Sequence, residues 1–452
     1  MASSNIKPST SDGRGSERVK RTSGNGGRHG STTTTKTKQS MVTKALIVSD
    51  RWGPTIRGGV TDGLHLAIRL LQNMGISVHC TALQASEEEE LEAKELDVTL
   101  ELPTKTGTLQ FREPHRDWLL HHNEYYPHLE ELANVKFVFG FSAFTSEAAF
   151  KILNKVFPKA SCYLINLFDE DDITPLIVGC SKVELEFRKR ILSDEFKKAK
   201  CSFSIGERVF AEYRGIYRET NQQLLSPMIN EEYLAPARSD KLPLLEREQF
   251  KIISVVQEYE FEDLKKLDVV IRAVNKAAEY THDLKKPPPV WKIVGIPKWK
   301  EEEIVEKLTR SSWLKITPKF VTNTDELNRH LLSSNLVLIP PSATNYGNLT
   351  LAAMCAAIPV VYPQGSYSDD IICKHMDLLE AGECAIDMDG DPEDLTKRIM
   401  SVVQKNPTAL HRASVIREHI KEKVAGDLKD SNGSFIAAIT ADMDGTAGDK
   451  MT

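Results

Sequence analysis

The sequence predicts an α/β protein with two doubly wound parallel sheets, and three observations support this prediction. Short apolar runs rich in β-branched residues alternate with segments whose apolar residues recur at helical spacing. This strand–turn–helix order is typical of parallel sheets that are covered by helices on both faces. The order stops in a polar stretch with three prolines at 226–248 and then starts again. The 452 residues, roughly three typical domain lengths, provide for two Rossmann-like domains with a linker and tails.

The first predicted domain, 41–225, begins with a buried strand at 45–49, a short apolar run with β-branched residues. Gly58 and Gly59 follow in a turn, and apolar residues at helical spacing predict a helix over 64–74 that ends at Gly75. Further strands are expected at 76–83, 135–139, 162–166 and 201–205, and further helices at 146–156 and 183–200.

The second predicted domain, 249–406, follows the linker at 226–248 and repeats the alternation. Strands are expected at 251–256, 290–294, 316–321, 336–340 and 359–362, and helices at 267–279, 301–309, 324–333, 349–356 and 394–404. The two halves therefore predict roughly six strands each, in two separate sheets. We expect the last helix, within 407–424, to cross back to the first domain.

Both ends of the chain differ in composition from the part between them. Residues 1–40 are rich in Ser, Thr and Gly and carry eight basic and two acidic residues, a net charge of +6. Such a segment cannot bury enough apolar surface to offset its chain entropy, so we expect a disordered basic tail. Its cluster at 18–21 is interpreted as part of this solvated tail, with a nuclear signal or an anionic-surface arm as alternatives. Residues 425–452, rich in Asp and Gly, are expected to form a disordered acidic tail.

Composition excludes several classes of function. The net charge of −6 does not favour nucleic-acid binding as the main task. No uncharged apolar run approaches the roughly 18 residues of a membrane-spanning helix. The seven cysteines are odd in number, scattered and never in Cys-x-x-Cys spacing, which favours buried reduced thiols in a cytoplasmic protein over a zinc site or disulfides.

The order of motifs in the second half resembles a known family. Landmarks lie at 265–273, 291–295, 324–327, 341–361 and 391–395, and the Gly58-Gly59 turn belongs to the same series. In this order they resemble the retaining, glycogen-synthase-like superfamily of GT-B glycosyltransferases, also described as family 4/1-like. The resemblance implies two Rossmann-like domains that face an interdomain cleft, and transfer of a sugar from a nucleotide-sugar donor to an acceptor hydroxyl. It implies no metal and no other cofactor.

The resemblance also implies which residues hold the donor. Gly58 and Gly59 would let backbone N–H groups approach a diphosphate at a helix N-terminus. Lys265, with Lys266 beside it, would neutralise the diphosphate leaving group. The donor would also face residues in the loop before the buried helix: Ser342, Asn345, Tyr346, Gly347 and Asn348. Each group has a simpler alternative. The glycine pair could form an ordinary turn, the lysine pair a solvated helix start, and the last group an ordinary strand-to-helix loop.

Several positions depart from the family pattern. Two glutamates that bind the donor in the family fall on Thr344 or Asn345 and on Ala352, so neither position is acidic. The family's arginine after the first strand of this half falls on Gln257, which is neutral. A histidine on the acceptor side falls near Phe141, which can neither carry a proton nor bind a hydroxyl.

Two functions therefore remain open from the sequence. The first is an active, hexosyltransferase-like enzyme, which would rely on leaving-group stabilisation and positioning. The second is a catalytically inactive homologue that binds a sugar, a nucleotide or a protein partner. The donor, the acceptor and any catalytic residue are not identified by the sequence.

Other polar clusters receive simpler interpretations. The acidic run at 169–172 is interpreted as a strand-end loop, and the segment 387–391 lacks the glycine placement and final glutamate of a calcium loop. His115, His121, His122 and His128 surround 125–127 and are interpreted as a polar surface segment, with an acceptor cleft as the alternative.

Overall fold

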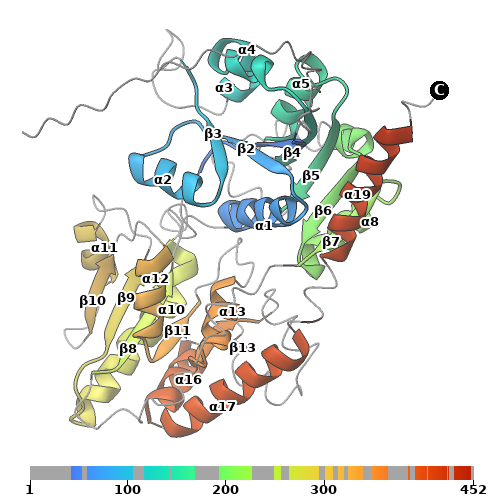
Figure 1. Cartoon of the computed structure of the whole chain (residues 1–452). Coiled ribbons are helices and arrows are strands. Elements are labelled where there is room, and N and C mark those ends of the chain that lie inside the picture. Colours follow the sequence, from blue (N-terminus) through green and yellow to red (C-terminus); the bar gives the residue numbers. More distant parts are fainter. Residues whose placement is uncertain are drawn as a thin grey trace, which may run out of the picture. The chain divides into compact units, whose positions relative to one another are not determined.

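The computed structural model describes most of the chain between the two termini (Figure 1). The described residues are 42–52, 59–104, 117–141, 145–167, 193–226, 249–255, 264–294, 301–308, 314–319, 324–339, 348–364, 385–386, 392–404, 406–424, 426 and 432–448. The basic tail predicted at 1–40 lies outside them, as does the predicted linker apart from its first residue, Ser226.

The first half of the chain forms a seven-stranded parallel sheet in the order β3-β2-β1-β4-β5-β6-β7. The strands are β1 (Lys44–Val48), β2 (Ser77–Thr81), β3 (Val98–Glu101), β4 (Val135–Phe141), β5 (Ser161–Asn166), β6 (Cys201–Ile205) and β7 (Gln222–Leu225). The helices are α1 (Gly59–Asn73), α2 (Glu87–Glu95), α3 (Asp117–Leu120), α4 (His122–Tyr125), α5 (Ser146–Lys155) and α8 (Glu207–Ile216), with a 3-10 helix η2 (Pro127–Glu131). The five predicted strands are confirmed; β3 and β7, at the two edges, were not predicted.

Side chains of β1 show how the sheet carries two cores. Ala45 and Ile47 lie in the apolar cluster that includes α1, whereas Leu46 and Val48 lie in the cluster that includes α5. Successive side chains of a strand point to opposite faces, so a strand that is buried on both faces is apolar throughout. This is why the run at 45–48 could be recognised from the sequence.

The second half forms a six-stranded parallel sheet in the order β10-β9-β8-β11-β12-β13. The strands are β8 (Lys251–Val255), β9 (Val290–Val294), β10 (Lys315–Lys319), β11 (Leu336–Leu338), β12 (Val360–Pro363) and β13 (Ala385–Ile386). The helices are α10 (Leu264–Asp283), α11 (Glu301–Leu308), α12 (Thr324–Leu332), α13 (Asn348–Cys355), α16 (Pro392–Gln404) and α17 (Asn406–His419), and α17 continues into a π-helix, η6 (Ile420–Val424). Helices α12, α13 and α17 share one core with the sheet, and α10 and α16 share the other.

The C-terminal part of the chain corrects two sequence expectations. The segment expected to cross back, 407–424, instead places Ile416 and Ile420 in the core of the second sheet. The helix that packs on the first sheet is α19 (Gly433–Gly448), within the segment expected to be a disordered acidic tail. Phe435 and Ile439 are fully buried there, and Met443 packs beside them. Their spacing of four residues forms an apolar stripe, which the Asp- and Gly-rich composition of the segment conceals.

The chain shows no membrane-spanning helix: within the described ranges, none of the helices is both long enough and apolar enough to cross a bilayer.

Candidate functional site

The strand orders define one preferred ligand position in each sheet. In doubly wound sheets, ligands bind beyond the carboxyl ends of the strands, at the point where the strand order reverses. The order reverses between β1 and β4 in the first sheet and between β8 and β11 in the second. The candidate site is therefore built from the segments that follow these four strands.

In the second sheet, the helices that follow the two central strands carry residues singled out by the sequence. Helix α10 follows β8 and has Lys265 and Lys266 in its first turn. Helix α13 follows β11 and begins at Asn348. Since β8 and β11 are parallel neighbours, both helices begin beyond the same edge of the sheet. The structure thus brings the lysine pair and Asn348 to the position where the strand order reverses.

In the first sheet, α1 follows β1 and begins at Gly59. Helix α1 is fifteen residues long, so its N-terminal N–H groups form a potential anion site. The remaining predicted donor residues, Gly58, Ser342, Asn345, Tyr346 and Gly347, lie outside the described residues, as do Thr344 and Gln257.

Two threonine hydroxyls fix the carboxyl end of β1 between its neighbouring strands. Thr81 Oγ1, at the end of β2, accepts a hydrogen bond from Ser49 N at 2.9 Å and donates to Ser49 O at 2.8 Å. Thr145 Oγ1 donates to Val48 O at 2.5 Å and accepts from Phe141 N at 3.0 Å, at the end of β4. These buried bonds hold the chain rigidly where it leaves the sheet toward α1.

Trp52 and His65 form an aromatic pair next to this exit, with ring centroids 5.5 Å apart. Burial, and secondarily the charge of Arg69, lowers the pKa of His65 to about 4. The imidazole is therefore neutral at pH 7, and it adds no charge near the start of α1.

A cluster of two histidines and a glutamate links β2, the carboxyl end of β3 and η2, and the sequence interpretation missed it. The Glu101 carboxylate lies 2.6 Å from His79 Nδ1 and 3.0 Å from His128 Nε2. His79 and Glu101, 22 positions apart, meet because β2 and β3 pair, and His128, 27 positions after Glu101, reaches the carboxylate from η2. No local spacing could therefore have revealed the cluster. This cluster connects η2 to the edge of the first sheet.

The histidines around 125–127 do not act as one group. His128 joins the Glu101 cluster, whereas His122 is buried, and burial, with Lys155 nearby, lowers its pKa. His115 lies outside the described residues. Within the described part of the chain, no group of His, Cys, Asp and Glu side chains could hold a metal ion.

Comparison with known families decides the classification. The model of a family described as "Family 4 Glycosyltransferase in conflict systems" matches residues 46–427, which is most of the chain. This chain is a family 4 glycosyltransferase. Enzymes of this type transfer a sugar from a nucleotide-sugar donor, and they have the GT-B fold. None of the curated protein sequences matches the chain.

Solved structures share the fold of this family 4 glycosyltransferase. Sucrose-phosphate synthase from Thermosynechococcus elongatus has a TM-score of 0.62 at 13% identity, with 88% of this chain and all of that one covered. TarM from S. aureus, in a complex that contains UDP, has a TM-score of 0.59 at 11% identity, covering 88% and 99%. A protein from E. coli bound to UDP-2-fluoro glucose has a TM-score of 0.56 at 11% identity, covering 87% and 98%. At these identities the likeness concerns the fold alone.

Two departures from the family 4 pattern can be examined in the structure. Ala352 lies in α13 at 5% exposure, inside the apolar core of the second sheet. Its methyl group cannot accept a hydrogen bond from a ribose hydroxyl, which in such a site is worth on the order of 1–3 kcal/mol. Phe141, at the end of β4, is 1% exposed and packs in the core beside α1. Neither side chain takes over the polar role that the family pattern gives its position.

Proposed function

We propose that this glycosyltransferase binds the diphosphate of its donor at the second sheet, beyond the carboxyl ends of β8 and β11. The observation that carries the proposal is the position of Lys265, Lys266 and Asn348 on the two helices that follow these strands, where the order reverses. A desolvated diphosphate requires a cation, because an uncompensated buried charge is prohibitively costly. The lysine pair supplies that cation.

The rest of the donor is bound by neutral groups in this proposal. Hydroxyl and amide groups of Ser342, Asn345 and Asn348, with Tyr346 and Gly347, take the place of the family's two carboxylates. Gly58 and Gly59 bring the N-terminus of α1 to the diphosphate. Transfer to an acceptor hydroxyl then depends on leaving-group stabilisation and positioning, and it needs no metal.

The proposed role of Lys265 can be tested by titration. Lys265→Ala is expected to weaken binding of UDP or GDP by at least about tenfold, or 1.4 kcal/mol. The matched control is Lys251→Ala, because Lys251 is exposed and lies at the opposite, amino end of β8. Gln257→Arg is expected to strengthen binding, because it restores a second cation. Isothermal titration of the three variants gives the affinities directly, and equal affinity for the parent and Lys265→Ala would exclude the proposed role.

A second function, donor binding without transfer, is favoured by Ala352 and Phe141. Both positions lack the polar groups of the family, and both side chains are buried among apolar neighbours. Release of nucleoside diphosphate from a bound donor distinguishes the two. An enzyme releases it faster than the free donor decays, whereas a binding protein protects the donor.

The cytoplasm remains the proposed location of the chain. Four cysteines of the described residues, Cys80, Cys162, Cys201 and Cys355, are buried free thiols. Burial raises the pKa of Cys201 and Cys355 to about 12, so these thiols stay protonated at neutral pH, and free thiols are typical of a reducing compartment. We propose that the active enzyme binds an acceptor and that the inactive alternative binds a protein partner. We propose no specific nucleic acid as a partner.

A further inference from the structure

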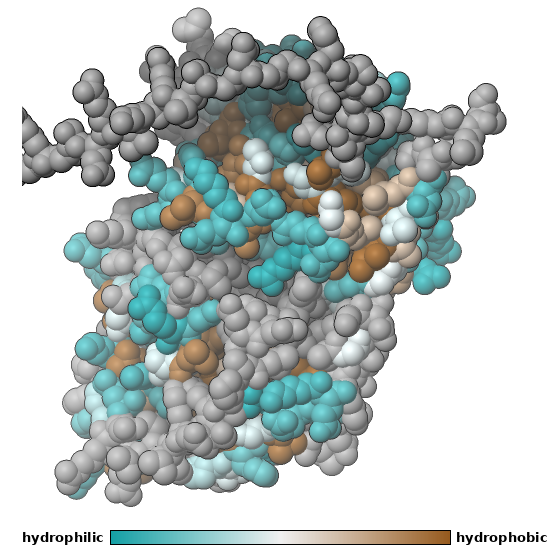
Figure 2. Space-filling view, viewed as in Figure 1, coloured by the Kyte–Doolittle hydropathy of each residue, from teal (hydrophilic) through white to brown (hydrophobic). Residues whose placement is uncertain are grey.

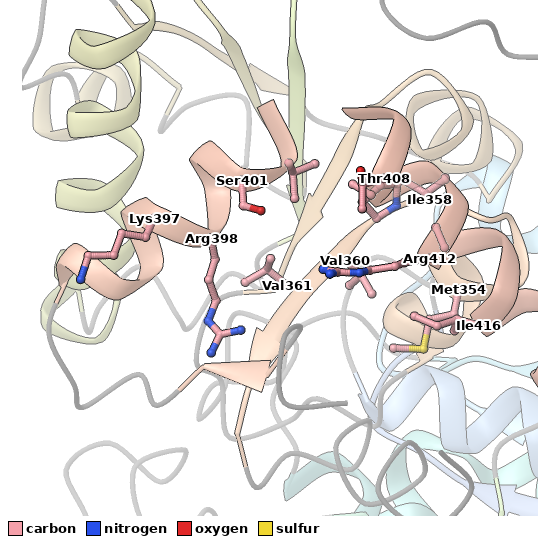
Figure 3. A pocket seen from close by; sticks show the side chains of 14 residues that line it. Met354, Ile358, Val360, Val361, Lys397, Arg398, Ser401, Thr408, Arg412 and Ile416 are labelled. Atoms are coloured by element: carbon pink, nitrogen blue, oxygen red, sulfur yellow. The ribbon is translucent and has the colours of Figure 1, made fainter. Parts of the chain in front are cut away.

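A cavity of about 620 Å³ lies in the second half of the chain, away from the proposed donor site (Figure 3). Its walls come from the segment entering β12, the end of α13, and the helices α16 and α17. Ile358, Pro359 and Val360 line it, so it opens at the amino end of β12. All strands of this sheet are parallel, which places the cavity at the opposite edge from the carboxyl ends of β8 and β11.

One side of the cavity is apolar. Val360 and Ile416 form this wall, together with Met354 from the end of α13, and all three belong to the same core. Each of them is largely buried by the core behind it. The wall therefore offers a dry surface to the body of a ligand, and the volume is within the roughly 300–1,000 Å³ of small-molecule sites.

The polar side of the cavity is cationic. Lys397, Arg398 and Arg412 line it, as do the hydroxyl residues Ser401 and Thr408. No acidic residue belongs to the lining within the described residues. Lys397 forms an ion pair with Asp394 at 3.0 Å and points away from the other lining residues in Figure 3. In the same view the guanidinium group of Arg398 lies below Val361 and that of Arg412 lies beside Val360.

We propose that this cavity binds a small organic phosphate, with its phosphate at Arg398 and Arg412 and its apolar body against Val360, Ile416 and Met354. Two guanidinium forks provide the planar, paired donors that phosphate oxygens prefer. The hydroxyl groups of Ser401 and Thr408 add neutral donors at the same side. The apolar wall requires a ligand with more than a phosphate group, because inorganic phosphate would leave that surface uncovered.

The test is isothermal titration of the full chain with three probes. 1-Naphthyl phosphate combines both features, 1-naphthol has only the apolar body, and inorganic phosphate has only the charge. We expect 1-naphthyl phosphate to bind at one site and each of the other two probes to bind at least about tenfold more weakly. Binding of inorganic phosphate as tight as that of 1-naphthyl phosphate would overturn the role of the apolar wall.

Substitution of the two arginines tests whether 1-naphthyl phosphate binds in this cavity. Arg398→Gln and Arg412→Gln are each expected to weaken the binding of 1-naphthyl phosphate about tenfold or more. The matched control is Arg329→Gln, because Arg329 is exposed on α12 and does not line the cavity. Circular-dichroism melting of each variant shows that it is folded before titration. Unchanged affinity in both arginine variants would overturn the proposal.

Competition experiments distinguish the cavity from the proposed donor site. Saturating UDP and the Lys265→Ala substitution are both expected to leave the affinity for 1-naphthyl phosphate unchanged. Displacement of 1-naphthyl phosphate by UDP would place it in the donor site and would overturn the second site. Failure of UDP to bind, by contrast, would affect only the proposed donor site.

Discussion

Gly140, in β4, shows how closely the first sheet approaches a helix. A Cβ atom at this position would lie 2.8 Å from Ala149 Cβ and 3.0 Å from Ser146 Cα, both in α5. Contacts this short with a helix cannot be relieved by turning a side chain. The absence of a side chain therefore allows β4 and α5 to pack at this distance, next to the end of β4 that faces the candidate site.

We predict that Gly140→Ala destabilises the protein by about 1–3 kcal/mol, the typical effect of overpacking a core. The control is Gly215→Ala, in α8, where an added Cβ meets no atom within 4 Å. Because alanine favours a helix over glycine by about 0.5–1 kcal/mol, this control is expected to retain or raise the melting temperature. Equal melting temperatures for the two variants would contradict the contact.

Glu195 is a buried carboxyl group, 5% exposed, beside the core that contains Phe196. Burial raises its pKa to about 7, partly opposed by a hydrogen bond from Ser146. A carboxyl in the unfolded chain ionises near pH 4.5. Between pH 4.5 and 7 the folded state binds more protons, so this group lowers stability as the pH rises through that interval.

Glu195→Gln is therefore expected to be more stable than the parent above pH 7, by about 1–3 kcal/mol. The difference should shrink as the pH falls toward 4.5, because the parent carboxyl is then neutral in both states. Glu219→Gln, at an exposed position that does not act on Glu195, is the control, and it should keep the pH dependence of the parent. Melting temperatures measured from pH 4.5 to 8 test this, and a constant difference over the interval would contradict it.

At the residue scale, the sequence could predict on which helices the proposed donor residues lie, but not which residues far away in the sequence come together. Lys265 and Asn348 follow strands that could be recognised from their apolar runs, so their positions on α10 and α13 were predictable. The Glu101 cluster was not, because His79 meets Glu101 through the pairing of β2 with β3 and His128 reaches it from η2. Long-range pairing leaves no local signal in one sequence.

At the element scale, α19 is the main difference between the predicted and the observed chain. Phe435 stacks on Phe139 with ring centroids 5.9 Å apart and lies 4.6 Å from the Phe203 ring. The Tyr163 hydroxyl donates to Asp442 Oδ2 at 2.9 Å, and Asn432 Oδ1 accepts from Ser226 N at 3.1 Å. The helix thus completes the core of the first sheet (Figure 1).

We predict that Phe435→Ala destabilises the protein by about 3–5 kcal/mol, because it leaves a cavity among aromatic rings. Ile436→Ala is the matched control, since the neighbouring Ile436 is 38% exposed. The control substitution is expected to destabilise the protein much less. If both variants melt at the parent temperature, α19 does not hold the first sheet in solution.

The edge strands β3 and β7 of the first sheet were missed for a related reason. Strand β3 has the sequence VTLE with only its first and last residues buried, and β7 is QQLL. Neither has the continuous apolar run of a central strand that is covered on both faces. The central strands of both sheets, by contrast, were predicted because their burial requires such a run.

At the scale of the whole molecule, the described residues on the face shown in the space-filling view include both hydrophilic and hydrophobic ones (Figure 2). The repeated strand–helix order was sufficient to predict two sheets and, through the order of motifs, a GT-B glycosyltransferase. The family match over residues 46–427 and the fold of the solved structures agree with that prediction. The loops that would complete the donor site could not be predicted from strand and helix periodicity, because loops carry none.

The measurement that tests the central claim most directly is a melting curve of the full chain with UDP-, GDP- and ADP-sugars at millimolar concentration. A ligand that binds only the folded state stabilises it by about 2.7 kcal/mol at one hundred times its dissociation constant. We predict that at least one donor raises the melting temperature, and that Lys265→Ala reduces this shift whereas Lys251→Ala preserves it. If no nucleotide sugar shifts the melting curve of the parent, the chain does not bind a donor and the account is wrong.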